Sequence, residues 1–226
     1  MDELERLIKV VKRLRDPQTG CPWDSVQTNR SIRRYLVEEA GEYLDALEEE
    51  NWDEVREELG DLLLQVVLNA QICQDEGRFD LQDIARDEAD KMIRRHPHVF
   101  GTSSAHTEEE RRRQWDAIKN AEPGNLTRKS ALDGVPRSMP ALARAQKTLS
   151  KIDRAGLPAP DFGELRGELT AAQSSQDTGD FSRHLGRLMF GLVALCRQHD
   201  VQAEEVLQDA IRAFHQAFRA NEDDTP

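Results

Sequence analysis

Residues 31–77 read SIRRYLVEEAGEYLDALEEENWDEVREELGDLLLQVVLNAQICQDEG. Apolar side chains recur in this stretch every three or four residues, the spacing at which side chains share one face of an α-helix. The pattern predicts one helix over about 31–50 and a second over about 53–76, which ends at Gly77. The connection between them, NWD (51–53), is short enough for the two helices to pack antiparallel.

The second of these helices is apolar on two opposite sides. One stripe consists of Leu59, Leu62, Leu63, Val66 and Ala70, and the other consists of Leu64, Leu68 and Ile72. A helix that is apolar nearly all round is typical of a protein core. We therefore expect this helix to be buried.

Acidic residues interrupt the apolar faces of both helices. Glu39 falls inside the apolar face of the first helix and Glu42 at its edge. In the second helix Asp61 falls inside the stripe of Leu64, Leu68 and Ile72, and Glu58 lies on a flank between the two stripes. Each pair is three residues apart and so shares a helix face. Aspartate and glutamate are rarely buried unless they are paired or bind a metal. Because the set contains only oxygen donors, it favours Mg²⁺ or Mn²⁺ over Zn²⁺.

The alternative for any acidic residue is that it is solvated or paired with a nearby arginine. We favour that alternative for the acids outside the apolar faces, which are Glu48, Glu49, Glu50 and Glu57. Arg33, Arg34 and Arg56 are the available partners. Glu39 and Asp61 lie among apolar neighbours, so for these two we favour the metal site.

A basic group follows at the end of the next expected helix, which starts near Asp80 and stops before Pro97. Lys91, Arg94 and Arg95 lie three and four residues apart on one face of it. Alone, a basic helix end is usually a surface feature that the helix dipole favours. Beside a carboxylate-bound Mg²⁺ it predicts a phosphate-binding group, because a polyphosphate needs both.

The remaining sequence predicts an all-α protein of two helical units. A helix over about 2–15 precedes the acidic pair, and Thr107 with Glu110 forms a capping box for a helix that carries Trp115 and Lys119. Proline and glycine predict a linker, and about four helices follow it, near 140–155, 161–173, 180–198 and 202–220. We expect a catalytic domain over 1–120, a linker over 121–139 and a second helical domain over 140–226.

Composition limits the possible partners and compartment. The net charge of −12 argues against sequence-independent binding of DNA or RNA. Three cysteines lie far apart, with no disulfide or zinc pattern, as is typical of the reducing cytoplasm. The N-terminus has no apolar signal region, and the longest apolar-rich stretch, 59–73, is too short to span a membrane. We expect a cytoplasmic protein.

Several segments resemble one known family. VEEAGE (37–42) followed by EELGD (57–61) is similar to the EExxE…ExxD signature of the MazG nucleoside triphosphate pyrophosphohydrolases. RLRDPQTGCPWDSVQT (13–28), RRHPHVFG (94–101) and QWDAIK (114–119) also resemble bacterial MazG. The same is true of DEGRF (75–79) and ALDGVPRSMPALARAQK (131–147), so the likeness covers roughly the first 150 residues.

The resemblance implies a helical homodimer with a four-helix core around each active site. It implies Mg²⁺-dependent hydrolysis of nucleoside triphosphates to the monophosphate and pyrophosphate, in the cleaning of nucleotide pools. Glu39, Glu42, Glu58 and Asp61 would hold the metal, and Glu38 would be a further ligand or the base that orients water. The substrate-binding residues would be Lys91, Arg94 and Arg95 at the phosphates and Trp23, Trp115 and Lys119 nearby. For Trp23 and Trp115 a place in the core is an equal alternative.

The second half departs from the family pattern. Shifting the chain by 126 residues aligns LGDLLLQVV (59–67) with LGRLMFGLV (185–193). In that alignment Glu164 and Glu168 match Glu38 and Glu42, but Leu165, His184 and Arg187 replace the other acids. An arginine in a magnesium site would repel the metal. We therefore expect a degenerate MazG-like domain with a structural or dimerisation role.

A different class of function is a helical regulatory or interaction protein that binds nucleotide and metal without turnover. The complete first set of acids favours the enzyme. A relative specialised for phosphoribosyl-ATP is disfavoured by the chain length and by the CPWD segment (21–24).

Overall fold

The computed structural model describes residues 2–103, 106–158 and 164–223. These residues form helices and connecting loops without a strand, which confirms the all-α prediction. The chain divides into two compact units, Met1–Ala121 and Glu122–Pro226. No helix within the described ranges combines the length and the hydropathy needed to cross a membrane.

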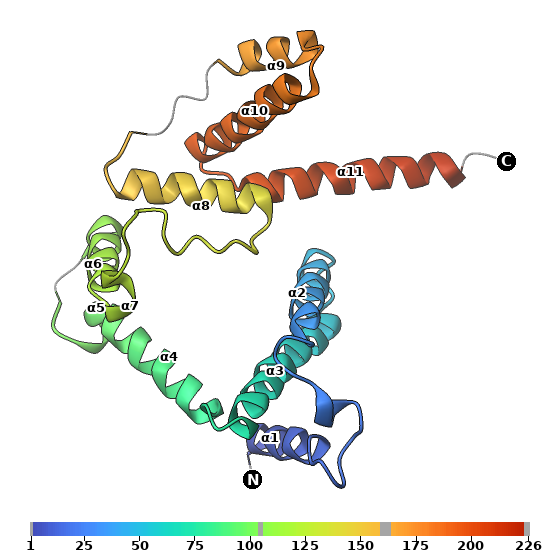
Figure 1. Cartoon of the computed structure of the whole chain (residues 1–226), viewed down its shortest axis with the longest axis vertical. Helices are drawn as coiled ribbons and strands as arrows, with labels where there is room; N and C mark the ends of the chain where they lie inside the picture. Colours follow the sequence, from blue (N-terminus) through green and yellow to red (C-terminus); the bar gives the residue numbers. More distant parts are fainter. Residues whose placement is uncertain (1, 104–105, 159–163, 224–226) are drawn as a thin grey trace. The chain divides into compact units, whose positions relative to one another are not determined.

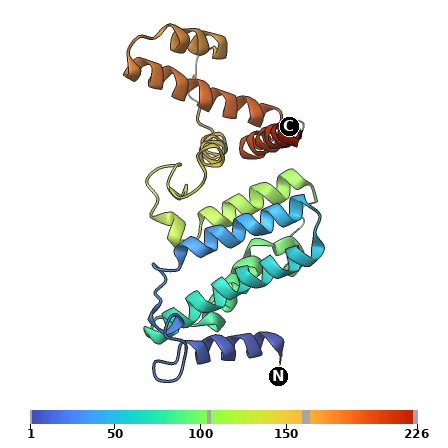
Figure 2. The same cartoon turned by 90° about the vertical axis from the view of Figure 1, so that its right-hand side faces the viewer.

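An antiparallel helix pair is the centre of the first unit. Its elements are α1 (Glu3–Leu14), the 3-10 turn η1 (Asp24–Val26), α2 (Arg33–Glu48), α3 (Trp52–Asp75), α4 (Leu81–Arg95), α5 (Pro97–Phe100) and α6 (Glu108–Asn120). Helices α2 and α3 lie side by side, and α1 packs against α3 (Figures 1 and 2). From the turn after α3, α4 diverges and meets α6 near its far end (Figure 1).

Local sequence signals set the ends of these helices. The Asn51 side chain accepts a hydrogen bond from the backbone N–H of Glu54 at the start of α3, and Gly77 follows α3 with a φ of +68°. Glycine adopts this left-handed conformation without steric cost. The capping box of Thr107 and Glu110 is present at the start of α6, as the sequence predicts.

The core of the first unit lies between α1, α2 and α3. Its buried side chains are Val11, Ile32, Val67, Leu68 and Ile72. On α3, the stripe that ends in Leu68 and Ile72 is therefore buried as expected.

The opposite stripe of α3 is partly exposed, so the prediction that this helix is buried all round is wrong. Leu59, Leu63 and Val66 are 48%, 42% and 43% exposed. Because α4 diverges from α3, this face stays uncovered by the described residues of the first unit. The exposed face is therefore available for packing against another molecule.

The second unit repeats the helix order of the first. It contains α7 (Pro123–Leu126), α8 (Ala141–Arg154), α9 (Leu165–Ser174), α10 (Thr178–Gln198) and α11 (Ala203–Asp223). Helices α9 and α10 pair as α2 and α3 do, and α8 packs against α10 as α1 packs against α3. Val193, which the 126-residue shift aligns with Val67, is 1% exposed in the second core.

The predicted linker and the predicted start of the second helix after it differ from the structure. The stretch 121–139, expected as a linker, contains α7 and contacts α8, since Lys151 Nζ donates a hydrogen bond of 2.6 Å to the backbone oxygen of Asp133. The helix expected from about residue 161 begins at Leu165, and residues 159–163 lie outside the described part of the chain.

A pair of matched substitutions tests this core. Val67 is 2% exposed in α3 and Val37 is 74% exposed in α2. Val67→Ala should lower the free energy of unfolding by about 2 kcal/mol, because it removes buried methyl groups and leaves a cavity. Val37→Ala should change it by less than about 0.5 kcal/mol. Urea unfolding measures both, and equal effects of the two changes would refute the placement of the core.

Candidate metal centre and nucleotide site

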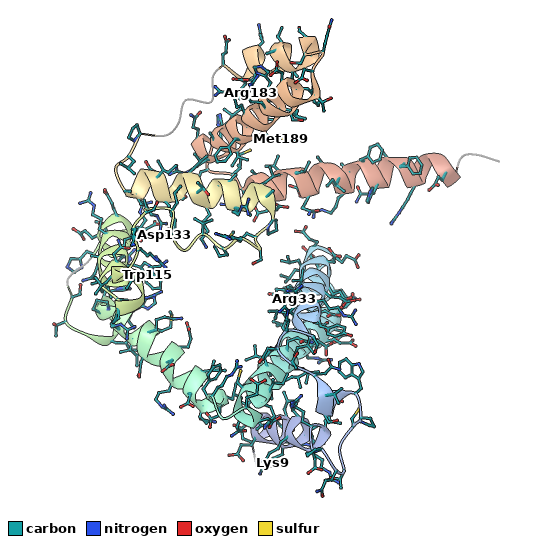
Figure 3. All side chains as sticks on the ribbon, viewed as in Figure 1. Lys9, Arg33, Trp115, Asp133, Arg183 and Met189 are labelled. Atoms are coloured by element: carbon teal, nitrogen blue, oxygen red, sulfur yellow. The ribbon has the colours of Figure 1, made fainter. Side chains whose placement is uncertain are left out.

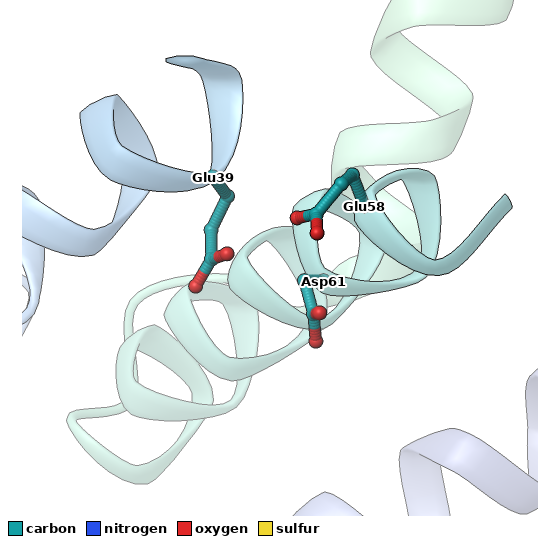
Figure 4. A group of neighbouring side chains, drawn as sticks. All are labelled: Glu39, Glu58 and Asp61. Carbon is teal, nitrogen blue, oxygen red and sulfur yellow. The ribbon is translucent and has the colours of Figure 1, made fainter. Parts of the chain in front are cut away.

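Three carboxylates meet where α2 and α3 face each other. Glu39 reaches from α2 towards Glu58 and Asp61 of α3 (Figure 4). One carboxylate oxygen from each residue lies within 4.8 Å of the others, and all three side chains are half-buried. Glu39 is 19 and 22 positions away from Glu58 and Asp61 in the chain, and the antiparallel pairing of α2 and α3 brings it to them.

The electrostatics of this group are unfavourable without a cation. Burial raises the pKa of Glu39, and the nearby charges of Asp61 and Glu42 raise it further. Burial also raises the pKa of Glu58, with added repulsion from Glu42 and Asp61. Glu58 Oε2 is buried and has no hydrogen-bond partner among the described residues. An all-oxygen cluster with an unsatisfied carboxylate fits a hard divalent cation.

The other two predicted acids lie around this cluster. Glu42 is exposed, and its charge acts on both Glu39 and Glu58. Glu38 is also exposed, and it acts on Arg34, whose pKa is raised chiefly by a hydrogen bond to Tyr35. The structure thus gathers Glu39, Glu58 and Asp61, with Glu42 beside them and Glu38 at the periphery.

A cavity of about 300 Å³ adjoins Glu39. Its wall also contains Trp23, whose ring meets that of Tyr35 edge-on with 6.0 Å between the ring centres. Gln65, which is 6% exposed, lies in the same wall and donates a hydrogen bond of 3.5 Å to Glu39 Oε1. The lining residues are Val11, Leu14, Trp23, Asp24, Tyr35, Glu39, Leu64, Gln65 and Leu68.

The sequence analysis missed Tyr35 and Gln65 as site residues. A signal for both was present, because Tyr35 precedes Glu39 by four positions and Gln65 follows Asp61 by four. Residues at that spacing share a helix face. The extended set combines aromatic and amide side chains with the acids, which suits an organic ligand next to a metal.

The predicted cations gather elsewhere in the first unit. On α4, Lys91 pairs with Glu88, and the Arg95 guanidinium lies 5.2 Å from the ring centre of Trp115 on α6. Figure 3 shows Trp115 on that helix, which also carries Lys119 in its last turn. Arg94 is exposed near the end of α4. Since α4 diverges from α3, one chain does not bring these cations to the acids.

In the second unit the corresponding place holds an ion cluster. The 126-residue shift aligns Glu168, His184 and Arg187 with Glu42, Glu58 and Asp61. His184 Nδ1 lies 2.7 Å from Glu168 Oε2, and Arg187 Nε donates a hydrogen bond of 2.6 Å to Oε1. These hydrogen bonds lower the pKa of Glu168. Two of the protein's own basic side chains therefore occupy positions where the first unit has acids.

An antiparallel helix pair that carries a cluster of carboxylates defines an all-helical protein with a candidate divalent-metal site. The sequence model described as the MazG nucleotide pyrophosphohydrolase domain matches residues 27–100, which include α2, α3 and the basic end of α4. Comparison with whole proteins gives the same family over nearly the full chain. The chain belongs to the MazG family of nucleotide pyrophosphohydrolases.

Two relatives illustrate the extent of the similarity. The nucleoside triphosphate pyrophosphohydrolase of Escherichia coli (strain K12) is 42% identical over 228 residues, which cover 97% of this chain and 87% of that protein. The nucleoside triphosphate pyrophosphohydrolase/pyrophosphatase MazG of Thermotoga maritima is 35% identical over 223 residues, which cover 97% of this chain and 85% of that protein. The similarity therefore extends over both units.

The carboxylate cluster predicts an effect on stability. Glu39→Gln should leave the melting temperature of the metal-free protein unchanged or raise it, because it removes one of several mutually repelling charges. It should also reduce the rise in melting temperature on addition of Mg²⁺. Calorimetry with and without EDTA measures both effects, and Glu49→Gln at the exposed end of α2 is the control. A metal-dependent rise equal to that of the wild type would place the metal elsewhere.

The ion cluster of the second unit predicts a pH-dependent effect. A lowered pKa means that the ionised Glu168 stabilises the folded state above the usual carboxyl pKa, and that this contribution disappears as the pH falls through the lowered value. Glu168→Gln should therefore lower the melting temperature at pH 7 and have a smaller effect near about pH 3. Glu164→Gln, at the N-terminus of α9, is the control. An effect of Glu168→Gln that does not depend on pH would contradict the ion cluster.

Proposed function

We propose that this chain hydrolyses nucleoside triphosphates, both ribo- and deoxyribonucleotides, to the monophosphate and pyrophosphate. The observation that carries the proposal is the cluster of Glu39, Glu58 and Asp61, with an unsatisfied carboxylate oxygen, in a member of the MazG family. The relative from Escherichia coli is named a nucleoside triphosphate pyrophosphohydrolase, which supports the proposal. A role in cleaning nucleotide pools agrees with such an activity.

Mg²⁺, with Mn²⁺ as a substitute, is the cofactor that the donor set favours. Glu39, Glu58 and Asp61 would hold it, and Glu42 would complete the set. The ion would neutralise charge on the phosphates and make a water molecule more acidic. Glu38 is exposed beside this group, where its carboxylate can accept a proton from water or orient it.

The cations of α4 and the cavity next to Glu39 are the two further parts of the proposed substrate site. Lys91, Arg94 and Arg95 provide positive charge for the phosphates, and Lys119 lies on the helix of Trp115. Trp23 contributes an aromatic wall to the cavity next to Glu39, where a base or sugar would fit. Trp115, against Arg95, is the second aromatic contact that we propose for the nucleotide.

We also propose a homodimer. The uncovered face of Leu59, Leu63 and Val66 supports it, because apolar patches of this kind mark protein interfaces. We propose that α4 of a second copy supplies the cations that one chain does not bring to the acid cluster. The second unit would be non-catalytic, with a structural or dimerisation role, since His184 and Arg187 stand where the first unit has acids.

The net charge of −12 supports a function without stable DNA or RNA binding. Three free cysteines support a place in the cytoplasm. Nucleotide binding without turnover is the competing function, and a product assay separates the two.

The identity of the products tests the proposed reaction. With Mg²⁺ and ATP or dATP, the purified chain should release the monophosphate and pyrophosphate in equal amounts, without accumulation of the diphosphate. Anion-exchange chromatography quantifies all of these products. Asp61→Asn should reduce the rate by at least about 100-fold, because it removes a proposed metal ligand. Primary release of ADP and orthophosphate would contradict cleavage at the α-phosphorus, and binding without any product would favour the competing function.

A further inference from the structure

The segment between α1 and α2 forms one wall of the cavity next to Glu39. It contains η1, and both Trp23 and Asp24 line the cavity. The segment is fixed at its two ends. At one end the backbone N–H of Cys21 donates a hydrogen bond of 2.7 Å to the backbone oxygen of Leu14. At the other end Asn29 Nδ2 donates a hydrogen bond of 2.7 Å to Asn69 Oδ1 on α3.

A buried arginine holds the middle of this segment. The side chain of Arg15 is only 7% exposed. Its Nη1 donates hydrogen bonds of 2.7 Å and 3.2 Å to the backbone oxygens of Asp24 and Gln27, at the start and just beyond the end of η1. The side chain of Gln27 in turn donates a hydrogen bond of 2.9 Å to the backbone oxygen of Trp23.

The same arginine is tied to the last turn of α3. Arg15 Nε donates a charged hydrogen bond of 2.7 Å to Asp75 Oδ2, and Asp75 Oδ1 accepts another of 2.7 Å from Gln71 Nε2. Arg15 thus connects the wall that carries Trp23 to the helix that carries Glu58 and Asp61. Only the planar, multi-donor guanidinium can contact two backbone oxygens and a carboxylate together in this way.

We propose that Arg15 and Asp75 are positioning residues that fix the Trp23 wall and thereby set the affinity for the base of the nucleotide. This inference rests on the proposed function, because it assumes that the cavity receives the nucleoside. The end contacts of the segment do not involve Arg15 or Asp75. Loss of the arginine contacts therefore loosens the wall while the chain stays folded and the acid cluster keeps its place.

The test compares three variants of the full-length chain. Arg15→Lys keeps the charge but cannot reach all three oxygens, and Asp75→Asn removes the carboxylate charge. Arg6→Lys is the matched control, because Arg6 forms an exposed pair with Glu3 on the same helix. Circular dichroism and the melting temperature establish that each variant is folded.

Kinetics with dATP, dGTP, dCTP and dTTP give the first readout. Arg15→Lys and Asp75→Asn should raise KM by on the order of tenfold, the size expected for a weakened aromatic contact with a base, and should reduce the differences in KM among the bases. The kcat should change by less than roughly twofold, because the acids are undisturbed. Inhibition by deoxynucleoside monophosphates should weaken, whereas inhibition by inorganic pyrophosphate should not. A lower kcat with unchanged KM and inhibition would reduce Arg15 to a structural role and overturn the proposal.

A second readout does not depend on turnover. In a chain with Trp52→Phe and Trp115→Phe, only Trp23 contributes tryptophan fluorescence. Acrylamide should quench Trp23 more strongly when Arg15→Lys or Asp75→Asn is added, and not when Arg6→Lys is added. Unchanged quenching would overturn the positioning role. A wild type that hydrolyses none of the substrates, with quenching as expected, would instead refute the proposed function.

Discussion

Repulsion among carboxylates is the constraint on which the first unit depends. Helices α2 and α3 hold oxygens of Glu39, Glu58 and Asp61 within 4.8 Å of one another, and burial already raises the pKa of the two glutamates. The hydrophobic contacts of α1, α2 and α3 must stabilise this arrangement when no cation is present. A divalent ion bound among these oxygens would relieve the repulsion and stabilise the folded state.

The two units differ in the charged side chains that they place between their paired helices. Both contain an antiparallel helix pair with equivalent core positions, Val67 and Val193. In the first unit the acids repel one another, whereas in the second Arg187 forms an ion pair with Glu168 and His184 lies within hydrogen-bond distance of it. The basic side chains at these two positions compensate the charge of Glu168 without a metal. They also leave the second unit without two of the oxygen donors that a metal would need.

Much of this arrangement was predictable from the sequence because it is local or periodic. The spacing of Glu39, Glu58 and Asp61 on amphipathic helices identified the acids, and the short connection identified the antiparallel pair. Periodicity gives the faces of a helix but not their partners, so the exposure of the Leu59 face was missed. The contact of Arg15 with Asp75 joins residues 60 positions apart, and no local pattern marks it.

The sequence analysis also missed two short helices and the contacts of the segment between α1 and α2. Helices α5 and α7, with four residues each, are too short to have a detectable period. Spacing places Tyr35 and Gln65 on the same helix faces as the acids, but it does not predict the contact between Tyr35 and Trp23, which depends on how the segment with η1 is placed. One chain does not bring the cations on α4 to the acids. Their place in the site therefore rests on the proposed homodimer.

Among the described residues, the acid cluster of the first unit is the site that we propose for the catalytic divalent ion. The most direct test is a titration of the metal-free, full-length chain with Mn²⁺, in which electron paramagnetic resonance counts the ions bound. Asp61→Asn should abolish the tight binding, and Glu168→Gln should leave it unchanged. Tight binding that survives Asp61→Asn, or that is lost with Glu168→Gln, would contradict this account.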